Sequence, residues 1–197
     1  TGYTVYRSEG AGGTDHPIVA HDGTGSTATA ATVSGLEGGR LYSFVVSGVS
    51  AAGTGAPSEA FTQSTSPGAP SGLGSEAQTT GSITLQWTAP AELGGDTVSE
   101  YVLYMDDGGG ESAAVSTEAY RGELSSSVLV EGLVGGSSYK FAVSAVSASG
   151  EGDRSEVMAQ STAPAAPGAA PVSVSQTASS IELSWTAPSV STGLGAT

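Results

Sequence analysis

The sequence contains no cysteine, so neither a disulfide bond nor thiol chemistry is available to this protein. It also contains no asparagine, which removes every acceptor for N-linked glycan. No apolar run approaches the roughly 20 residues that a membrane-spanning helix needs. We therefore expect a fold that is stabilised by packing and backbone hydrogen bonds alone, and no membrane insertion.

Basic residues are also scarce. The chain has 5 Lys and Arg residues against 19 Asp and Glu residues, a formal net charge of -14, and Lys140 is its single lysine. Nucleic acids and anionic membranes bind proteins through Lys and Arg side chains, which neutralise phosphates. The charge balance therefore argues against nucleic acid and membrane surfaces as partners.

One ten-residue pattern occurs twice, and each copy contains one of the two tryptophans, Trp87 and Trp185, which lie 98 residues apart. Before each tryptophan, apolar residues alternate with polar ones, so the apolar side chains and the indole share one face of a strand. A repeat of this length can bury enough apolar surface to fold without disulfides. We expect each tryptophan to lie in the core of its repeat.

Between the two tryptophans, short alternating segments are separated by turns rich in Gly, Ser and Asp. The clearest segment begins at Tyr139 and alternates strictly from 139 to 146. No stretch has a sustained period of 3.6 residues, so we expect almost no helix. Seven short strands spaced by roughly 8–12 residues predict an all-β fold, an antiparallel β-sandwich.

Several features of the second repeat occur together in one known family. They are Trp87, the Tyr101-x-Leu103 pair, Leu133 six residues before Tyr139, and the segment 145–152. As a set, they resemble a fibronectin type III domain. The resemblance implies an immunoglobulin-like sandwich with Trp87 on strand B and a tyrosine corner at Tyr139, where strand F begins. Family members usually carry a proline before this tyrosine, and here two glycines replace it, so we expect a looser corner.

The spacing divides the chain into three parts. Residues 67–162 correspond to a complete repeat, residues 1–64 to strands C to G of a partial one, and residues 165–197 to strands A and B of another. Prolines between the parts, at 64–70 and 162–167, predict short and semi-rigid linkers. The residues expected in the cores are Trp87, Trp185, Tyr42, Leu36, Tyr139 and Leu133.

The two partial repeats are complementary. Joining Thr197 to Thr1 would place the next tyrosine 15 residues after Trp185, against 14 residues between Trp87 and Tyr101. Two explanations stay open: the chain is a window of a longer tandem array, or the missing strands come from a neighbouring copy, which gives a head-to-tail polymer. In both cases we expect a physiological object that is longer than this chain.

Few residues are candidates for chemistry. His16 and His21, the two histidines, are five apart and face opposite sides of a predicted edge strand, so we expect surface residues and no shared metal ion. Asp106, Asp107 and Glu111 lack the spacing of a dedicated calcium loop and are interpreted as a solvated turn. We expect no catalytic residue, no metal and no cofactor.

Tyr6 and Tyr104 lie on the outward face of their predicted strands and are the best candidates for a contact surface. The first hypothesis for function is a non-catalytic structural segment of an extracellular or cell-surface filament, stalk or adhesin. The alternatives are a module that binds a protein or a glycan, and a spacer in a secreted carbohydrate-active enzyme. Neighbouring repeats or copies of the same protein are the expected partners, with other extracellular proteins or glycans as alternatives.

Overall fold

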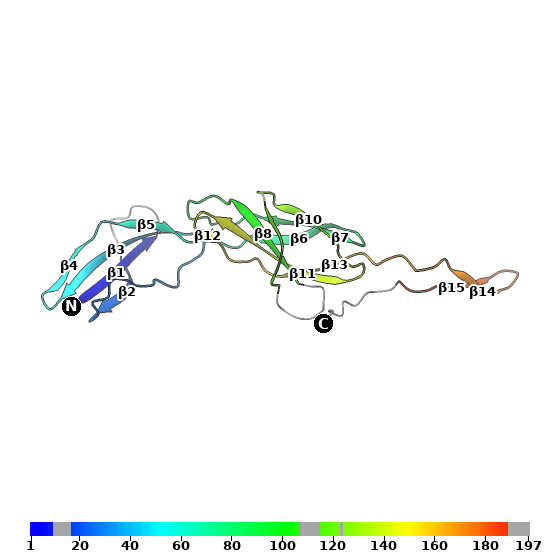
Figure 1. Cartoon of the computed structure of the whole chain (residues 1–197), viewed down its shortest axis with the longest axis horizontal. Helices are drawn as coiled ribbons and strands as arrows, with labels where there is room; N and C mark the ends of the chain where they lie inside the picture. The colour runs from blue at the N-terminus through cyan, green and yellow to red at the C-terminus, as the bar shows by residue number, and fades with distance from the viewer. Residues whose placement is uncertain (10–16, 107–114, 123, 189–197) are drawn as a thin grey trace.

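The computed structural model describes residues 1–9, 17–106, 115–122 and 124–188. These ranges contain strands and no helix, and the strands form three bodies in a row (Figure 1). The strands are β1 (Gly2–Glu9), β2 (Ile18–Thr24), β3 (Leu41–Ser50), β4 (Gly53–Pro57), β5 (Phe61–Ser64), β6 (Ser71–Gln78), β7 (Ser82–Thr88), β8 (Glu100–Met105), β9 (Thr117–Gly122), β10 (Ser127–Glu131), β11 (Ser138–Ser147), β12 (Gly150–Glu151), β13 (Met158–Ser161), β14 (Val172–Gln176) and β15 (Ile181–Ser184).

The middle body, β6 to β13, is a two-layer antiparallel sandwich, as the alternation predicts. One sheet has the order β10-β7-β6, and the other has the order β12-β11-β8-β9, with β13 also paired to β11. Apolar side chains of both sheets meet between the layers, because every second residue of each strand points inward. The buried core residues are Ile83, Leu85, Trp87, Tyr101, Leu103, Tyr139, Phe141, Val143 and Ala145.

The first body, β1 to β5, has one sheet of order β2-β1-β3-β4, with β5 also paired to β3. It reproduces the second sheet of the sandwich. The correspondence of residues 1–64 to strands C to G predicts a further strand before the corner at Tyr42, but residues 26–40 form no strand. In the middle body the corresponding strand, β10, pairs with β7, and the described residues of the first body include no strand equivalent to β7. The expected strand is absent because it has no partner for its backbone hydrogen bonds.

The third body is the hairpin β14–β15, which repeats the hairpin β6–β7 in detail. In β6 the register with β7 shifts between Ser75 and Ala77, and in β14 the register with β15 shifts at the equivalent place, between Ser173 and Ser175. A Thr–Ser side-chain hydrogen bond of 2.7 Å closes each turn. The third body therefore has the geometry of the first two strands of the complete sandwich.

Both tyrosine corners are formed. The Tyr139 hydroxyl accepts a hydrogen bond from the Val134 amide at 2.8 Å, and the Tyr42 hydroxyl accepts one from the Glu37 amide at 3.0 Å. The expected loosening is not seen, since these distances are ordinary for hydrogen bonds. Gly136 has φ of 72°, a conformation that glycine adopts without strain, so this glycine fits the turn that leads into the corner.

The first and middle bodies are joined by direct contacts. Arg40 pairs with Glu92 at 3.3 Å, and the hydroxyls of Ser64 and Ser149 are 2.9 Å apart. Gly39 packs so closely that a Cβ atom there would collide with the Glu92 carbonyl oxygen. These contacts join loops of the two bodies directly, in addition to the linker, and the stiffness of the linker stays a prediction.

Candidate functional site

The inner face of the β1–β3 sheet is open. A hollow of about 650 Å³ lies against it, lined by apolar side chains that include Val5, Phe44 and Phe61. Tyr3 is 40% exposed, whereas its equivalent in the sandwich, Tyr101, is 3% exposed. The difference follows from the missing layer, because Tyr101 lies in a core between two sheets, and in the described part of the chain no second sheet lies opposite Tyr3.

The hairpin β14–β15 also exposes the face that the sandwich buries. Ile181 and Leu183 are exposed large apolar residues, and Trp185 is 63% exposed, whereas Trp87 is 5% exposed. The prediction that Trp185 is a core residue is wrong for the isolated chain. Its strand has the correct alternation, but burial needs a second sheet opposite the strand, and in the described residues β15 pairs with β14 alone.

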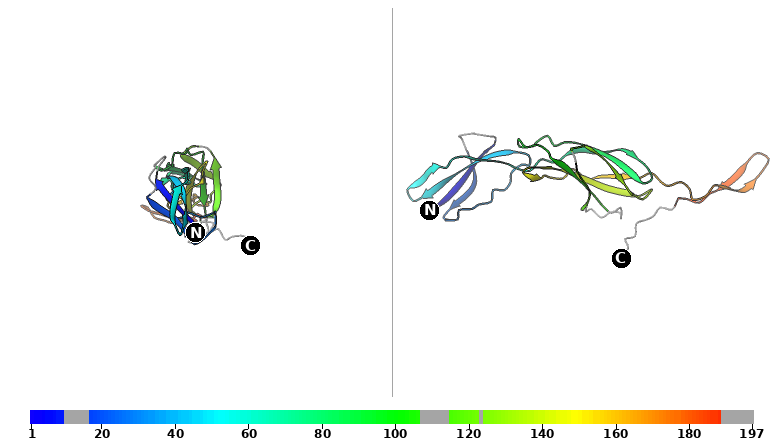
Figure 2. Two further views of the ribbon diagram at one scale, coloured as in Figure 1. Left: turned by 90° about the vertical axis from the view of Figure 1, so that its left-hand side faces the viewer. Right: turned by 45° about the horizontal axis from the view of Figure 1, so that its top comes forward.

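The sandwich shows what these open faces lack. Trp87 packs its ring against the edge of Tyr101, with 5.3 Å between the ring centroids and 67° between the planes. This pair joins the two layers, and such an edge-to-face contact adds to the free energy gained by burial. The equivalent residues are Trp185, which follows β15, and Tyr3 of β1. The strands β1 and β15 lie toward opposite ends of the molecule (Figures 1 and 2).

The outward face of the second sheet is not an open contact surface. Tyr104, predicted to be a contact residue, is only 7% exposed. The Arg154 guanidinium lies 3.4 Å from the centroid of its ring and donates a hydrogen bond to the Val115 carbonyl. Alternation correctly places Tyr104 on the outer face, but these residues from distant parts of the chain cover it. The prediction that Tyr104 is an exposed contact residue is therefore wrong, because the side chain is buried.

A hydrogen-bonded carboxylate anchors this face. Glu151 accepts hydrogen bonds from the hydroxyls of Ser144 at 2.6 Å and Tyr104 at 2.5 Å. These bonds hold the pKa of the Glu151 carboxyl below its ordinary value, with the bond from Ser144 as the largest cause and the bond from Tyr104 as the next. The charge of Arg121 also lowers this pKa. Burial is the main cause that raises the pKa of the Tyr104 phenol, and its hydrogen bond to Glu151 raises it further.

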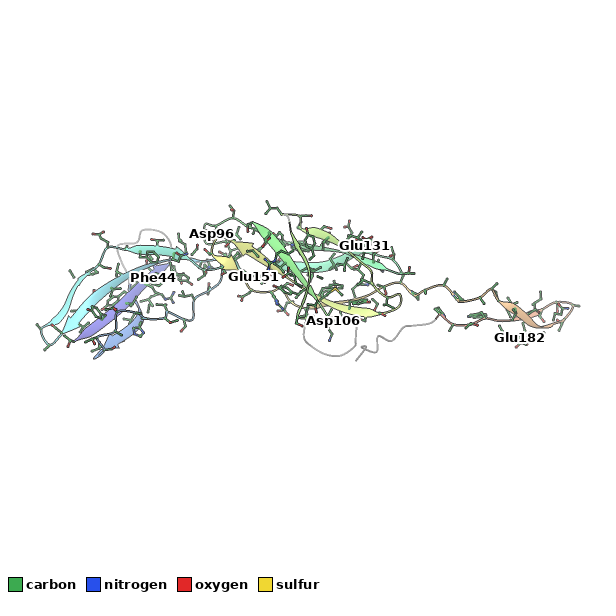
Figure 3. All side chains as sticks on the ribbon, viewed as in Figure 1. Phe44, Asp96, Asp106, Glu131, Glu151 and Glu182 are labelled. Carbon is green, nitrogen blue, oxygen red and sulfur yellow. The ribbon has the colours of Figure 1, made fainter. Side chains whose placement is uncertain are left out.

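Arg121 completes the cluster by pairing with several carboxylates. Its guanidinium lies 2.6 Å from Glu100, 3.1 Å from Glu118 and 3.8 Å from Glu151. The charges of this face are therefore used within the sheet, and we interpret the cluster as a support for the fold. Figure 3 labels Glu151 near the end of the sandwich that faces the first body, and it labels Phe44 in the first body.

Tyr6, the other predicted contact residue, is half-buried on the outer face of β1. The residue equivalent to Glu151 in the first body is Thr54, which is exposed and carries no charge. Tyr6 therefore lacks the carboxylate that binds the hydroxyl of Tyr104. Its prediction as a contact residue stays open.

The remaining predicted core residues lie within their bodies. Tyr42, Trp87 and Tyr139 are buried, and Leu36 and Leu133 are partly buried. Leu133 packs against the core of the sandwich, whereas Leu36 lines the hollow of the first body. The same leucine position thus contacts a filled core in one body and an open face in the other.

Of the residues considered for metal binding, the structure describes His21 and Asp106. His21 is half-buried on β2, and Asp106 is buried with its carboxylate accepting a hydrogen bond from the Lys140 amide at 3.0 Å. His16, Asp107 and Glu111 lie outside the described residues. Among the residues that the structure describes, no three His, Asp or Glu side chains are grouped so that they could hold a metal ion.

In the described residues, no helix is long and apolar enough to cross a membrane.

The chain is 36% identical over 160 residues to chitinase A1 of Niallia circulans, and the match covers 76% of this chain and 20% of the chitinase. It is 33% identical over 171 residues to the receptor-type tyrosine-protein phosphatase F of Danio rerio, which covers 84% of this chain and 9% of the phosphatase. The chain thus spans less than a quarter of either relative.

A solved fibronectin type III domain of human fibronectin type III domain containing protein 3 is 27% identical, with a TM-score of 0.46, and the match covers 52% of this chain and 92% of that one. The family description "Fibronectin type III domain" matches residues 68–161. These residues are the sandwich β6 to β13, with the tyrosine corner and the layered core described above. Residues 68–161 of the chain belong to the fibronectin type III family.

Proposed function

We propose that the chain is a non-catalytic spacer of a longer extracellular protein, in which its repeats set the distance and angle between neighbouring parts. The observation that carries this proposal is the joint between the first two bodies. Direct contacts between loops of both bodies, rather than the linker alone, hold them in line, and a flexible tether would need none of these contacts.

The joint is built from one turn of the first body and two loops of the sandwich. The turn before β3 supplies Gly39 and Arg40, and the sandwich supplies Glu92 and Ser149 from two of its loops. Ser149 also donates to Asp96 at 2.6 Å, and this bond is the first cause that lowers the pKa of the Asp96 carboxyl. A joint of this kind transmits orientation, which is what a spacer requires.

The absence of cysteine makes the proposal directly testable. Cysteines introduced at Glu59 and Glu131, both exposed, would carry two spin labels, and pulsed electron spin resonance would measure the distance between them. Samples mixed with an excess of unlabelled chain report distances within one chain. We expect a narrow distance distribution. A broad one would contradict a spacer that fixes orientation.

Gly39→Ala and Gly35→Ala provide a matched pair for the same measurement. Both glycines have φ near 70° (69° and 71°), so both substitutions carry a similar backbone strain, but only a Cβ at position 39 would meet the sandwich. We expect Gly39→Ala to broaden the distance distribution and Gly35→Ala to leave it narrow. Equal distributions for both variants would show that the contact does not hold the joint.

The match with a chitinase favours one particular setting for this role. The chain covers only a fifth of chitinase A1, so a spacer beside the catalytic domain of a carbohydrate-active enzyme is the second candidate. The first candidate, a filament or stalk, predicts further near-identical repeats in the parent protein. Sequencing the parent gene distinguishes the two, because the second candidate predicts an unrelated domain with paired carboxylates.

A further inference from the structure

A chain of hydroxyl groups crosses the joint between the first body and the sandwich and ends at a carboxylate. Asp96, in the loop between β7 and β8, accepts hydrogen bonds from the hydroxyls of Ser149 at 2.6 Å and Ser147 at 3.1 Å. The Ser149 hydroxyl lies 2.9 Å from that of Ser64, at the end of β5. Figure 3 labels Asp96 near the end of the sandwich that faces the first body. Two hydroxyls therefore connect Asp96 to the first body.

The charge of Asp96 sets the direction of this hydroxyl chain. An ionised carboxylate only accepts hydrogen bonds, and each hydroxyl has one proton to donate. Because Ser149 donates its proton to Asp96, Ser64 must donate its own proton to Ser149. Hydrogen bonds to an ionised group are roughly twice as strong as those between neutral groups. The ionised carboxylate therefore supports a contact between the two bodies.

The loop that carries Asp96 also packs directly on Ser64. Gly94 has φ of 62°, and a Cβ atom there would lie 2.9 Å from the Cβ atom of Ser64. This close approach of the loop backbone requires glycine. It places the Asp96 loop on the end of β5, where the hydroxyl chain crosses the joint.

The first body and the sandwich end in the same way. The Thr65 hydroxyl donates a hydrogen bond to the Glu37 carbonyl at 2.7 Å. The Thr162 hydroxyl donates one to the Val134 carbonyl, also at 2.7 Å. A serine precedes each of the two threonines. The end of a repeat therefore does not distinguish one joint from the next.

The loop that follows each end is different. Gly94 and Asp96 lie seven and nine residues after the first tryptophan, and the residues at the same distances after the second tryptophan are Thr192 and Leu194. Residues 189–197 include no Asp or Glu. The sequence thus provides a carboxylate for the hydroxyl chain of the first joint and none in the corresponding stretch of the next repeat.

We propose that ionised Asp96, acting through Ser149 and Ser64, holds the first joint at its angle, and that loss of this charge releases the joint. This inference rests on the spacer role, because it names the group that controls the joint. It also assigns the control to the loop of the following repeat, so that joints along one chain can differ in stiffness.

The pKa of Asp96 and the contact across the joint are linked. The hydrogen bond from Ser149 is the main cause that lowers the pKa of the Asp96 carboxyl, and the Ser64 hydroxyl of the first body also lowers it. A contact that favours the ionised carboxyl is itself favoured by ionisation. The contribution is complete above the pKa of the carboxyl in the open joint, and it is lost as the pH falls through the lower pKa of the closed joint.

Other charged groups lie near Asp96. Glu9 of β1, Arg40 from the turn before β3, and Glu92 line the hollow beside it, whereas β5 and the turn after β11 present hydroxyls. Arg40 pairs with Glu92 at 3.3 Å. Because acid also protonates Glu92 and weakens this pair, the first test changes Asp96 at constant pH.

The first test uses the full chain at pH 7 with spin labels at positions 59 and 131. We expect Asp96→Asn to broaden the distance distribution, since a neutral amide no longer directs both hydroxyls. Asp153→Asn is the charge-matched control, because Asp153 is an exposed carboxylate beside the same joint, and it should leave the distribution narrow. Far-ultraviolet circular dichroism checks that each variant is folded.

The second test leaves the carboxylate in place and follows its titration by carbon-13 nuclear magnetic resonance. Ser64→Ala removes the hydroxyl of the first body, and Ser161→Ala removes the equivalent hydroxyl at the end of β13. We expect Ser64→Ala to shift the titration midpoint of Asp96 upward, toward its ordinary value of 3.8. Ser161→Ala should leave the midpoint unchanged.

The outcomes separate this inference from the spacer role. The inference is overturned if Asp96→Asn leaves the distances as narrow as in the unaltered chain, if Asp153→Asn broadens them equally, or if Ser64→Ala does not move the midpoint. In each of these cases a narrow distribution in the unaltered chain leaves the spacer role standing. A broad distribution in the unaltered chain contradicts the spacer role and this inference together.

Discussion

The first and middle bodies contain the same sheet, and one sheet has a covering layer while the other has none. Within the sheet itself, most features survive this difference. Ser58 and Ser155 each accept an amide hydrogen bond from the strand beside them at 3.1 Å, and both tyrosine corners form. Two things differ in the first body. The inner face of its sheet is more exposed, and residues 26–40 form no strand equivalent to β10. Local hydrogen bonding is therefore set within the sheet, and burial is set between layers.

The outer faces of the two sheets differ in another way. In the sandwich, Arg121, Glu151 and Arg154 form a charged cluster around Tyr104. In the first body the positions equivalent to Glu151 and Arg154 are Thr54 and Pro57, and no such cluster can form there. The repeats thus share a fold but not a surface, which gives each repeat its own dependence on pH.

The largest expected difference is between the two tryptophans. Trp87→Ala removes a buried indole and should lower the free energy of unfolding of the sandwich by about 3–5 kcal/mol, enough to unfold a domain of ordinary stability. Trp185→Ala removes an exposed indole and should change the stability of the monomeric chain by less than about 0.5 kcal/mol. Denaturant unfolding at low protein concentration measures both. Equal losses would contradict the assignment of one buried and one exposed ring.

The tyrosine corners should give a smaller and equal loss in both repeats. Tyr139→Phe and Tyr42→Phe each remove one hydrogen bond to a loop amide, which is worth about 1 kcal/mol. Because each bond lies within its own sheet and corner, the missing layer should not alter the cost. Hydrogen exchange at the amides of Val134 and Glu37 follows each corner separately. A loss confined to the sandwich would show that the first corner contributes nothing without its covering layer.

Most of what the sequence predicts correctly concerns alternation within a strand. Trp87, Tyr42 and Tyr139 are buried as expected, because each sits in a strand whose inward positions are apolar. Trp185 has the same pattern and is exposed, since alternation identifies a face but not whether another layer covers it. For Tyr104 the error is the reverse: it is predicted to be exposed and is buried, because Arg154, 50 residues further along the chain, covers it. Contacts between distant segments leave no periodic signal in a single sequence.

Acid should affect the sandwich through Glu151, whose pKa is lowered in the folded state from its ordinary value of 4.5. A carboxyl with a lowered pKa stabilises the fold fully above its unfolded pKa, and this contribution is lost as the pH falls through the folded pKa. We expect the sandwich to lose stability below about pH 4.5, and Glu151→Gln to lose less over the same range. Thermal unfolding of both proteins at pH 7 and pH 3 measures this. Identical losses would show that other carboxyls determine the response to acid.

The smallest effect is expected at the joint, where the two bodies meet through Arg40. The equivalent residue at the next joint is Ser137, so Arg40→Ser makes the first joint resemble the second. Arg40 is substantially exposed in its pairs with Glu37 and Glu92, and exposed ion pairs contribute about 0–1 kcal/mol. We expect little change in the free energy of unfolding. At low salt, the variant should have slightly broader spin-label distances than the unaltered chain. This difference should disappear at high salt, because salt screens the ion pair of the unaltered chain. The broadening expected of Gly39→Ala should instead persist at high salt, because a steric contact is not screened, and this contrast separates packing from charge as the source of alignment.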